Sequence, residues 1–259
     1  MKNIVKTEFF KMKRYSVLWI GVATMALVVL LSRFMATASD GAVHTLSNFS
    51  STVIWNNLVL IYPATITLIA GYIIERERTD DTLKNILTIP ISFRKILAGK
   101  MIATGLLTII LSCIEFVFTM AVFFISGFPG FSFLGAVHIL FQMISINLLS
   151  YIAVLPIIAF TGQRSGTFMA GVGFAFFYGF IGMMASGHGL RDVYPITAGL
   201  SIIQYQEAGV TMTGNPFISI IVLAAILLVT LLIGLNAKNR DMKTSAKRQE
   251  KLQQLSTHK

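Results

Sequence analysis

Charged residues are scarce in this chain of 259 residues, and their scarcity limits what the protein can be. Only 12% of the residues are Asp, Glu, Lys or Arg, whereas a typical soluble domain has roughly 25%. Hydrophobic residues make up 55% of the chain. This balance excludes an ordinary soluble enzyme or binding domain and is typical of a protein with several membrane spans.

Cysteine and the common catalytic motifs are also missing. Cys113 is the single cysteine, which excludes an internal disulfide. The sequence has no HExxH, G-x-S-x-G or CxxC motif, and its "AGKM" at residues 98–101 lacks the first glycine and the final Ser or Thr of a phosphate-binding loop. His138 has no Cys or acidic residue at ligand spacing. We therefore expect no catalytic residue, no metal site and no cofactor in this chain.

Long apolar runs dominate what is present. Six of them stand out, at residues 16–32, 53–74, 101–126, 134–160, 167–186 and 217–235. Each has, or nearly has, the roughly 20 residues that a helix needs to cross a membrane. Lipid offers no hydrogen-bond partner to an open backbone, so each run is expected to be helical. The prediction is an all-α integral membrane protein, with six transmembrane helices within residues 16–236.

The cations fall almost entirely on one side of this topology. Of the 21 lysines and arginines, only Arg33 and Arg191 lie in connections on the opposite side. The positive-inside rule then places both termini in the cytoplasm. This asymmetry accounts for the formal net charge of +10 without a nucleic-acid partner, for which the chain has no recognition motif.

Three polar or mixed segments border the spans. Residues 1–15 carry a partial apolar stripe among five cations, which predicts an amphipathic helix in the membrane interface, with a frayed cytosolic leader as the alternative. Residues 187–214 are too apolar for a free linker, so short re-entrant-like helices that enter the outer leaflet are expected there. Residues 237–259 form a basic cytosolic tail.

Between the second and third spans lies "ERERTDDTLKNILTIPISFRKILAGK", residues 75–100. Asp80 and Asp81 suit a helix N-terminus. Apolar residues follow at helical spacing, Pro90 stops the helix, and Ser92 can cap a new helix that leads into the third span. The pattern predicts a short amphipathic helix over about residues 79–90. From the residues alone it is either a loop that rests on lipid or a docking element for a cytosolic partner. Its apolar residues are Leu83, Ile86 and Leu87.

This segment resembles the signature of ABC-2-type permeases, the membrane subunits of a class of ATP-driven exporters. The matching positions are Glu75 and Glu77, Thr82, Ile86 with Leu87, Pro90, Ser92 with Arg94, and Lys100. Asp81 departs from the usual glycine, and Phe93 is inserted between Ser92 and Arg94. The predicted topology resembles the same family over the whole chain.

The resemblance implies that residues 79–90 are a coupling helix, which fits a cleft in an ATP-binding subunit. Its three apolar residues would pack into that cleft, and Glu75, Glu77 and Arg94 would form ion pairs at the rim. Asp80, Asp81, Thr82 and Pro90 complete the expected contact set. ATP and Mg²⁺ would be bound and ATP hydrolysed by that separate subunit. Such permeases work in pairs, as two copies or as two related chains.

Glu115 lies in the middle of the third apolar run. An ionisable residue at membrane depth is by default a candidate functional residue. It could line a translocation pathway together with Asn147 and meet a cationic substrate. Alternatively, it could be protonated and hydrogen-bonded to a polar group on another span, such as Asn147 or Gln142.

Within the family, chains of this length with small external loops resemble permeases of the bacterial plasma membrane. Those permeases export antimicrobial peptides such as lantibiotics or bacitracin, confer immunity to them, or export peptide toxins. Export of a lipid, a glycan precursor or a small drug is the alternative within transport. A membrane scaffold and a secondary carrier are the alternatives outside ABC export.

Overall fold

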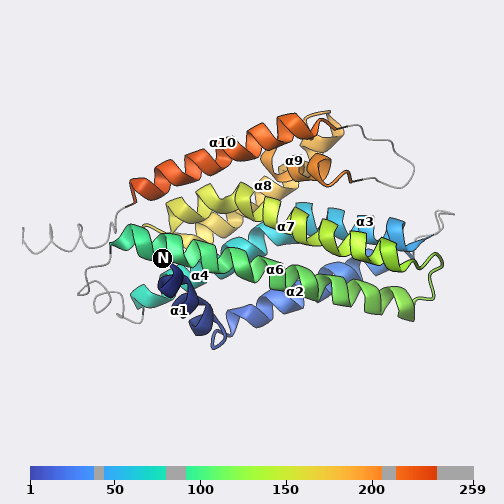
Figure 1. Ribbon diagram of the computed structural model, residues 1–259, viewed down its shortest axis with the longest axis horizontal. Helices are drawn as coiled ribbons and strands as arrows, with labels where there is room; N and C mark the ends of the chain where they lie inside the picture. The colour runs from blue at the N-terminus through green and yellow to red at the C-terminus, as the bar shows by residue number, and fades with distance from the viewer. Residues whose placement is uncertain (38–43, 80–91, 206–213, 238–259) are drawn as a thin grey trace, which may run out of the picture.

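The computed structural model describes residues 1–37, 44–79, 92–205 and 214–237, and the regular elements in these ranges are all helices (Figure 1). In chain order they are α1 (Lys2–Met12), α2 (Val17–Met35), α3 (Leu46–Asn56), the π-helix η1 (Asn57–Ile61), α4 (Tyr62–Thr79), α6 (Phe93–Ile125), α7 (Phe133–Thr161), α8 (Phe168–Gly187), α9 (Pro195–Ile202) and α10 (Pro216–Leu235). The prediction of an all-α fold is confirmed.

Among the described residues, six helical segments are long and apolar enough to cross a membrane, which agrees with the predicted number of spans. They are Val17–Met35, Leu46–Glu77, Phe93–Ile125, Phe133–Thr161, Phe168–Gly187 and Pro216–Leu235. The second and third are longer than the apolar runs at 53–74 and 101–126 that predicted them. The helices continue into polar sequence, where residues such as Glu77 and Lys100 find partners inside the protein.

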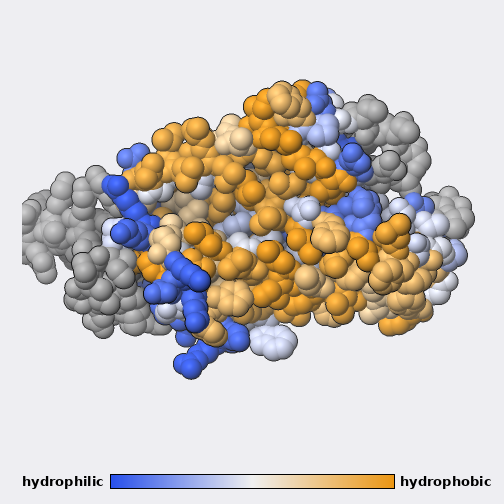
Figure 2. All heavy atoms as spheres, viewed as in Figure 1, coloured by the Kyte–Doolittle hydropathy of each residue, from blue (hydrophilic) through white to orange (hydrophobic). Residues whose placement is uncertain are grey.

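The helices form an elongated bundle with α4 near its centre. α4 packs against α2, α6, α7 and α8, and the span that contains it is the most buried of the six. α10 is the least buried span and packs mainly on α7 and α9. The surface over α10, α7 and α6 is largely apolar, while hydrophilic residues gather at the end where α1 lies (Figure 2). This division is the one expected of a bundle immersed in lipid.

The second span is not a regular α-helix. The π-helix η1 separates α3 from α4, and Pro63 follows two residues after it. Proline lacks the N–H that would reach the carbonyl of Val59, four residues earlier, and its ring crowds that carbonyl. A π-turn widens the helix at such a point. α8 approaches here so closely that a Cβ on Gly179 would lie 2.9 Å from the Val59 carbonyl oxygen.

Gly179→Ala is therefore expected to destabilise the protein by about 1–3 kcal/mol, because the added methyl group meets rigid backbone. Gly173→Ala is the matched control on the same helix, since a Cβ there has no neighbour within 4 Å. The control should be neutral or slightly stabilising, because alanine favours helix more than glycine does. Thermal unfolding of the two purified variants in detergent measures the difference, and equal midpoints would refute the close packing.

In the described part of the chain, two short helices lie outside the spans. α1 packs against the first turns of α6, and Glu8 and Met12 are its buried residues. α9 falls within residues 187–214 and packs between α7 and α10. The placement of α1 in the membrane interface and of α9 in the outer leaflet stay predictions. The coupling helix predicted near 79–90 and the predicted tail lie almost wholly outside the described residues.

Candidate functional site

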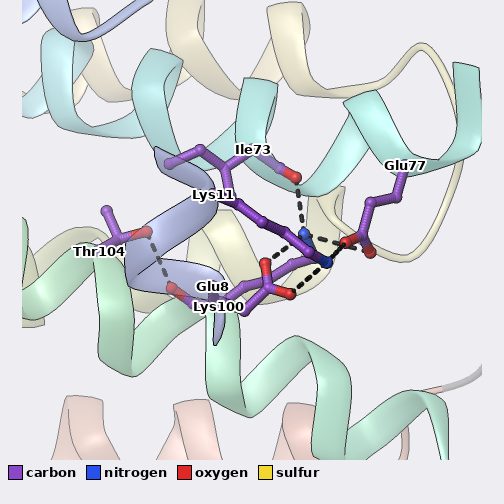
Figure 3. Close-up of polar contacts among 6 residues, drawn as sticks. All are labelled: Glu8, Lys11, Ile73, Glu77, Lys100 and Thr104. Carbon is purple, nitrogen blue, oxygen red and sulfur yellow. Dashed lines mark hydrogen bonds and ion pairs between the residues drawn. The ribbon is translucent and has the colours of Figure 1, made fainter. Parts of the chain in front are cut away.

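Four charged side chains meet where α1 contacts the end of α4 and the start of α6 (Figure 3). Lys11 Nζ, from α1, lies 3.0 Å from Glu8 Oε1 on the same helix and 2.8 Å from Glu77 Oε1 on α4. Lys100 Nζ, from α6, lies 2.9 Å from Glu8 Oε2 and 3.3 Å from Glu77 Oε2. Each carboxylate thus faces both ammonium groups. We call this closed arrangement of Glu8, Lys11, Glu77 and Lys100 the charge ring.

Most of the charge ring is shielded from solvent. The side chains of Glu8, Glu77 and Lys100 are only 5%, 6% and 3% exposed, and Lys11 is 36% exposed. Lys100 Nζ also donates a hydrogen bond to the carbonyl oxygen of Ile73 on α4 at 2.9 Å. An isolated buried charge costs several kcal/mol, but here two negative and two positive groups compensate one another. The ring can therefore be buried only as a set.

Charge pairing shifts the ionisation of the ring members on α1. Burial raises the pKa of Glu8, but Lys100 and Lys11 outweigh it and hold that pKa below its ordinary value of 4.5. Burial lowers the pKa of Lys11, but hydrogen bonds and charge from Glu77 and Glu8 outweigh it and raise that pKa above its ordinary value of 10.5. An acid whose pKa is lowered by folding contributes stability that is lost as the pH falls through its folded pKa. A base whose pKa is raised by folding contributes stability that is lost as the pH rises through its folded pKa.

Glu8→Gln is accordingly expected to lower the thermal unfolding midpoint by a constant amount near neutral pH. The deficit should shrink as the pH falls below the ordinary Glu8 pKa of 4.5, because the wild-type carboxylate then becomes protonated as well. Unfolding midpoints of wild type and variant, measured side by side from about pH 3 to pH 8, test this sign. A deficit that stayed the same across that range would show that the Glu8 charge contributes nothing.

The charge ring sits at both ends of the predicted coupling segment. In the sequence, residues 80–91 follow α4, which ends at Thr79, and precede Ser92, the residue before α6. Glu77 is two residues before the point of departure, and Lys100 lies two turns into α6. Their contact ties the two ends of the segment together and joins both to α1. The N-terminal helix is thus part of the same structural unit as the segment.

Two other residues of the predicted contact set also hold neighbouring elements. Glu75 Oε1 accepts hydrogen bonds from Ser165 Oγ at 2.7 Å and from the backbone N–H of Gly166 at 2.9 Å, in the connection between α7 and α8. Gly166 has φ +73°, a conformation that favours glycine. Arg94 Nε donates to the carbonyl oxygen of Ala237, just beyond α10, at 3.4 Å.

The structure therefore places Glu75, Glu77 and Arg94 at one end of the bundle, in contacts within the chain. For Glu77 these are the ion pairs of a buried side chain. Their contacts with an ATP-binding subunit stay predictions. The other members of the predicted set fall outside the described residues, namely Asp80, Asp81, Thr82, Leu83, Ile86, Leu87 and Pro90.

A second polar cluster lies at membrane depth around Glu115. Asn57 Nδ2, from η1, donates to Glu115 Oε1 at 2.9 Å. Asn147 Nδ2, from α7, donates to Glu115 Oε2 at 2.7 Å and reaches Ser112 Oγ at 3.0 Å. Glu115, Asn57 and Asn147 are each at most 1% exposed. The cluster joins the second, third and fourth spans, and in this conformation it is closed to the surface.

The cluster contains the hydrogen bond that the second alternative from the sequence requires, and the protonation of Glu115 stays a prediction. Glu115 is hydrogen-bonded to Asn147, whereas Gln142 donates instead to the carbonyl oxygen of Ile203. A role for Glu115 and Asn147 in a substrate pathway stays a prediction. Sequence reasoning missed Asn57, although the pair Asn56–Asn57 inside an apolar run was a usable signal. It also missed Glu8 and Lys11, whose partners are distant in the sequence.

In the described ranges, no three His, Cys, Asp or Glu side chains gather into a group that could hold a metal ion.

Comparison with known proteins identifies the family of this chain. A search of curated protein sequences finds no match. A family model described as "ABC-2 family transporter protein" matches residues 4–182, well over half of the chain. The match runs from α1 into α8 and includes the charge ring and the Glu115 cluster. Members of this family are multi-pass membrane subunits of ABC transporters and generally work with an ATP-binding subunit. This chain therefore belongs to the ABC-2 family of transporter proteins.

Proposed function

We propose that this chain is the permease subunit of an ABC exporter in a bacterial plasma membrane. Its substrates are amphipathic peptides, such as antimicrobial peptides or peptide toxins, which it removes from the membrane or the cell. The observation that carries the ABC mechanism is the charge ring, which holds the end of α4, the start of α6 and α1 together. A segment that receives force from a partner needs such a rigid base.

In this mechanism residues 79–90 form the coupling helix and dock in a cleft of the ATP-binding subunit. Leu83, Ile86 and Leu87 enter the cleft. The partner binds ATP and Mg²⁺ and hydrolyses the ATP. When two such subunits close, the displacement passes through the charge ring to α4, α6 and α1, which move as one body. The permease acts as a pair, with a second copy or a related chain, and both of its termini lie in the cytoplasm.

The substrate class is supported by family resemblance and by the shape of the outer side. The connection between α6 and α7 spans only residues 126–132, and α9 packs against the bundle. Among the described residues, these connections form no protruding receptor, which suits substrates that enter laterally from the bilayer. Amphipathic peptides partition into that interface. The step from fold to substrate is an analogy with related permeases.

A peptide-sensitivity panel tests the proposal. A sensitive bacterial strain would express the partner ATPase with this chain, the ATPase alone, or this chain with an ATPase unable to hydrolyse ATP. We expect the inhibitory concentration of at least one cationic amphipathic peptide to rise several-fold, only when the chain and active ATPase are both present. Unchanged sensitivity to every peptide at normal membrane levels would reject the substrate class. Protection that survives the inactive ATPase would reject ATP-driven export.

A further inference from the structure

We propose that the groove between α6 and α10 binds an acyl chain of an anionic phospholipid, whose phosphate contacts Arg94 and Lys95. The groove has a volume of about 410 Å³, within the usual range of roughly 300–1,000 Å³ for small-molecule sites. Its walls come from the first turns of α6 and the last turns of α10, and Tyr151 and Leu155 of α7 line its base.

The body of the groove is suited to hydrocarbon. Leu97, Met101, Leu227 and Leu231 are among the residues that line it. The lining hydroxyl groups are engaged within the protein: Tyr151 Oη donates to the Met101 carbonyl at 2.6 Å, and Thr230 Oγ1 donates to the Ile226 carbonyl at 2.8 Å. Neither hydroxyl proton is left to recognise a polar ligand. Burial of methylene groups is then the main attraction, at about 0.8 kcal/mol for each.

The groove has the length of one lipid leaflet. Its lining on α6 extends from Arg94 to Gly105, which at 1.5 Å per residue is roughly 16 Å of helix. Half of a hydrocarbon core is about 15 Å thick. An acyl chain that begins at the polar end would therefore reach the middle of the bilayer inside the groove.

Charge decides which lipid fits. Arg94 and Lys95 are adjacent, exposed and at the polar end of the groove, and no residue that lines it is acidic in the described part of the chain. The contact of Arg94 Nε with Ala237 O sets its guanidinium between α6 and the end of α10. Two cations above an apolar groove match one negative phosphate above an acyl chain, and cations near a membrane surface attract anionic headgroups. On the proposed orientation this lipid belongs to the inner leaflet.

Two variants test the apolar groove and its cations separately. Gly234 lines the groove on α10, and a Cβ there would meet nothing within 4 Å. Gly234→Trp therefore adds an indole to the groove lining, and its Cβ meets no other part of the protein. Gly173→Trp is its control, since that glycine is equally open on α8. Lys95→Glu reverses the charge at the polar end and leaves the groove open. Lys13→Glu, at an exposed lysine outside this groove, controls for net charge.

Native mass spectrometry of the full-length chain measures lipid retention. The protein would be released from micelles that contain phosphatidylglycerol or phosphatidylcholine with identical acyl chains. We expect wild type to retain phosphatidylglycerol at least several-fold better than phosphatidylcholine. Gly234→Trp and Lys95→Glu should both lose that retention, and both controls should keep it. If Gly234→Trp does not fold, Lys95→Glu against Lys13→Glu decides.

Three results would overturn the proposal. Equal retention of the two headgroups would remove the role of the cations. Retention by Gly234→Trp equal to that of Gly173→Trp would place the lipid elsewhere. A change in oligomeric state on Gly234→Trp, with lipid retention intact, would show that a second copy of the chain covers the groove instead.

Discussion

Lys100→Met is expected to destabilise the protein by about 3–5 kcal/mol, the usual effect of removing one partner from a buried ion pair. The substitution leaves Glu8 and Glu77 buried with Lys11 as their remaining partner in the charge ring. It also removes the donor to the Ile73 carbonyl. Lys13→Met is the control. Lys13 is exposed and directly follows α1, the helix that carries Glu8 and Lys11, so its substitution should change the free energy of unfolding by no more than about 0.5 kcal/mol.

A double variant separates charge balance from lost packing. Lys100→Met combined with Glu77→Gln leaves one acid, Glu8, and one base, Lys11, which still contact each other at 3.0 Å. We expect it to be more stable than Lys100→Met alone, with a coupling of about 0.5–3 kcal/mol between the two sites. Denaturation of all variants in one detergent provides the comparison. A Lys100→Met variant as stable as Lys13→Met would mean that the ring has no structural importance.

Glu115→Leu is the second substitution with a large expected effect. It removes the acceptor for two buried amide groups, those of Asn57 and Asn147. Hydrogen bonds between membrane spans average about 0.6 kcal/mol and reach about 1.7, so two lost bonds predict a destabilisation of about 1–3 kcal/mol. Replacing Glu115, Asn57 and Asn147 together with leucine removes the donors as well and should recover part of the loss.

Glu115→Gln separates stability from transport. Glutamine keeps the shape of the side chain and one carbonyl acceptor but removes the carboxyl group. If Glu115 meets a cationic substrate, export should fall to background while the membrane level of the chain stays normal. The measurement is peptide export, or the protection that it confers, normalised to the amount of chain. Full export by this variant would remove the carboxylate from the pathway.

Much of the bundle follows from local sequence, because apolar length and helix punctuation are local properties. The six spans were predictable for this reason, and so was the start of α10. Asn215 caps that helix by accepting from the Phe217 N–H at 3.0 Å, and Pro216 occupies its first turn, as the dipeptide predicts. Ser92 does precede α6 as its N-cap, but its side chain makes no capping hydrogen bond there.

The candidate site was only partly predictable, because it depends on partners far apart in the chain. Lys100 and Glu77 belong to a recognisable segment, but the contact between Lys100 and Glu8 requires α1 to lie across α6, and these two residues are 92 positions apart. Likewise, the π-turn before Pro63 changes the direction of the side chains on α4 relative to that of Asn57 in the same span. The hydrophobic periodicity of the sequence predicts neither the packing of α1 across α6 nor the π-turn.

The central claim is that the predicted coupling helix, about residues 79–90, binds an ATP-binding subunit from a base that the charge ring holds rigid. Co-purification of an epitope-tagged chain with its partner ATPase tests it most directly. The variant carries Leu83→Asp, Ile86→Asp and Leu87→Asp, and the control carries Leu252→Asp and Leu255→Asp in the tail. We predict that the ATPase is lost from the triple variant at normal membrane levels and retained by the control. An ATPase that remained bound to the triple variant in wild-type amount would contradict the account.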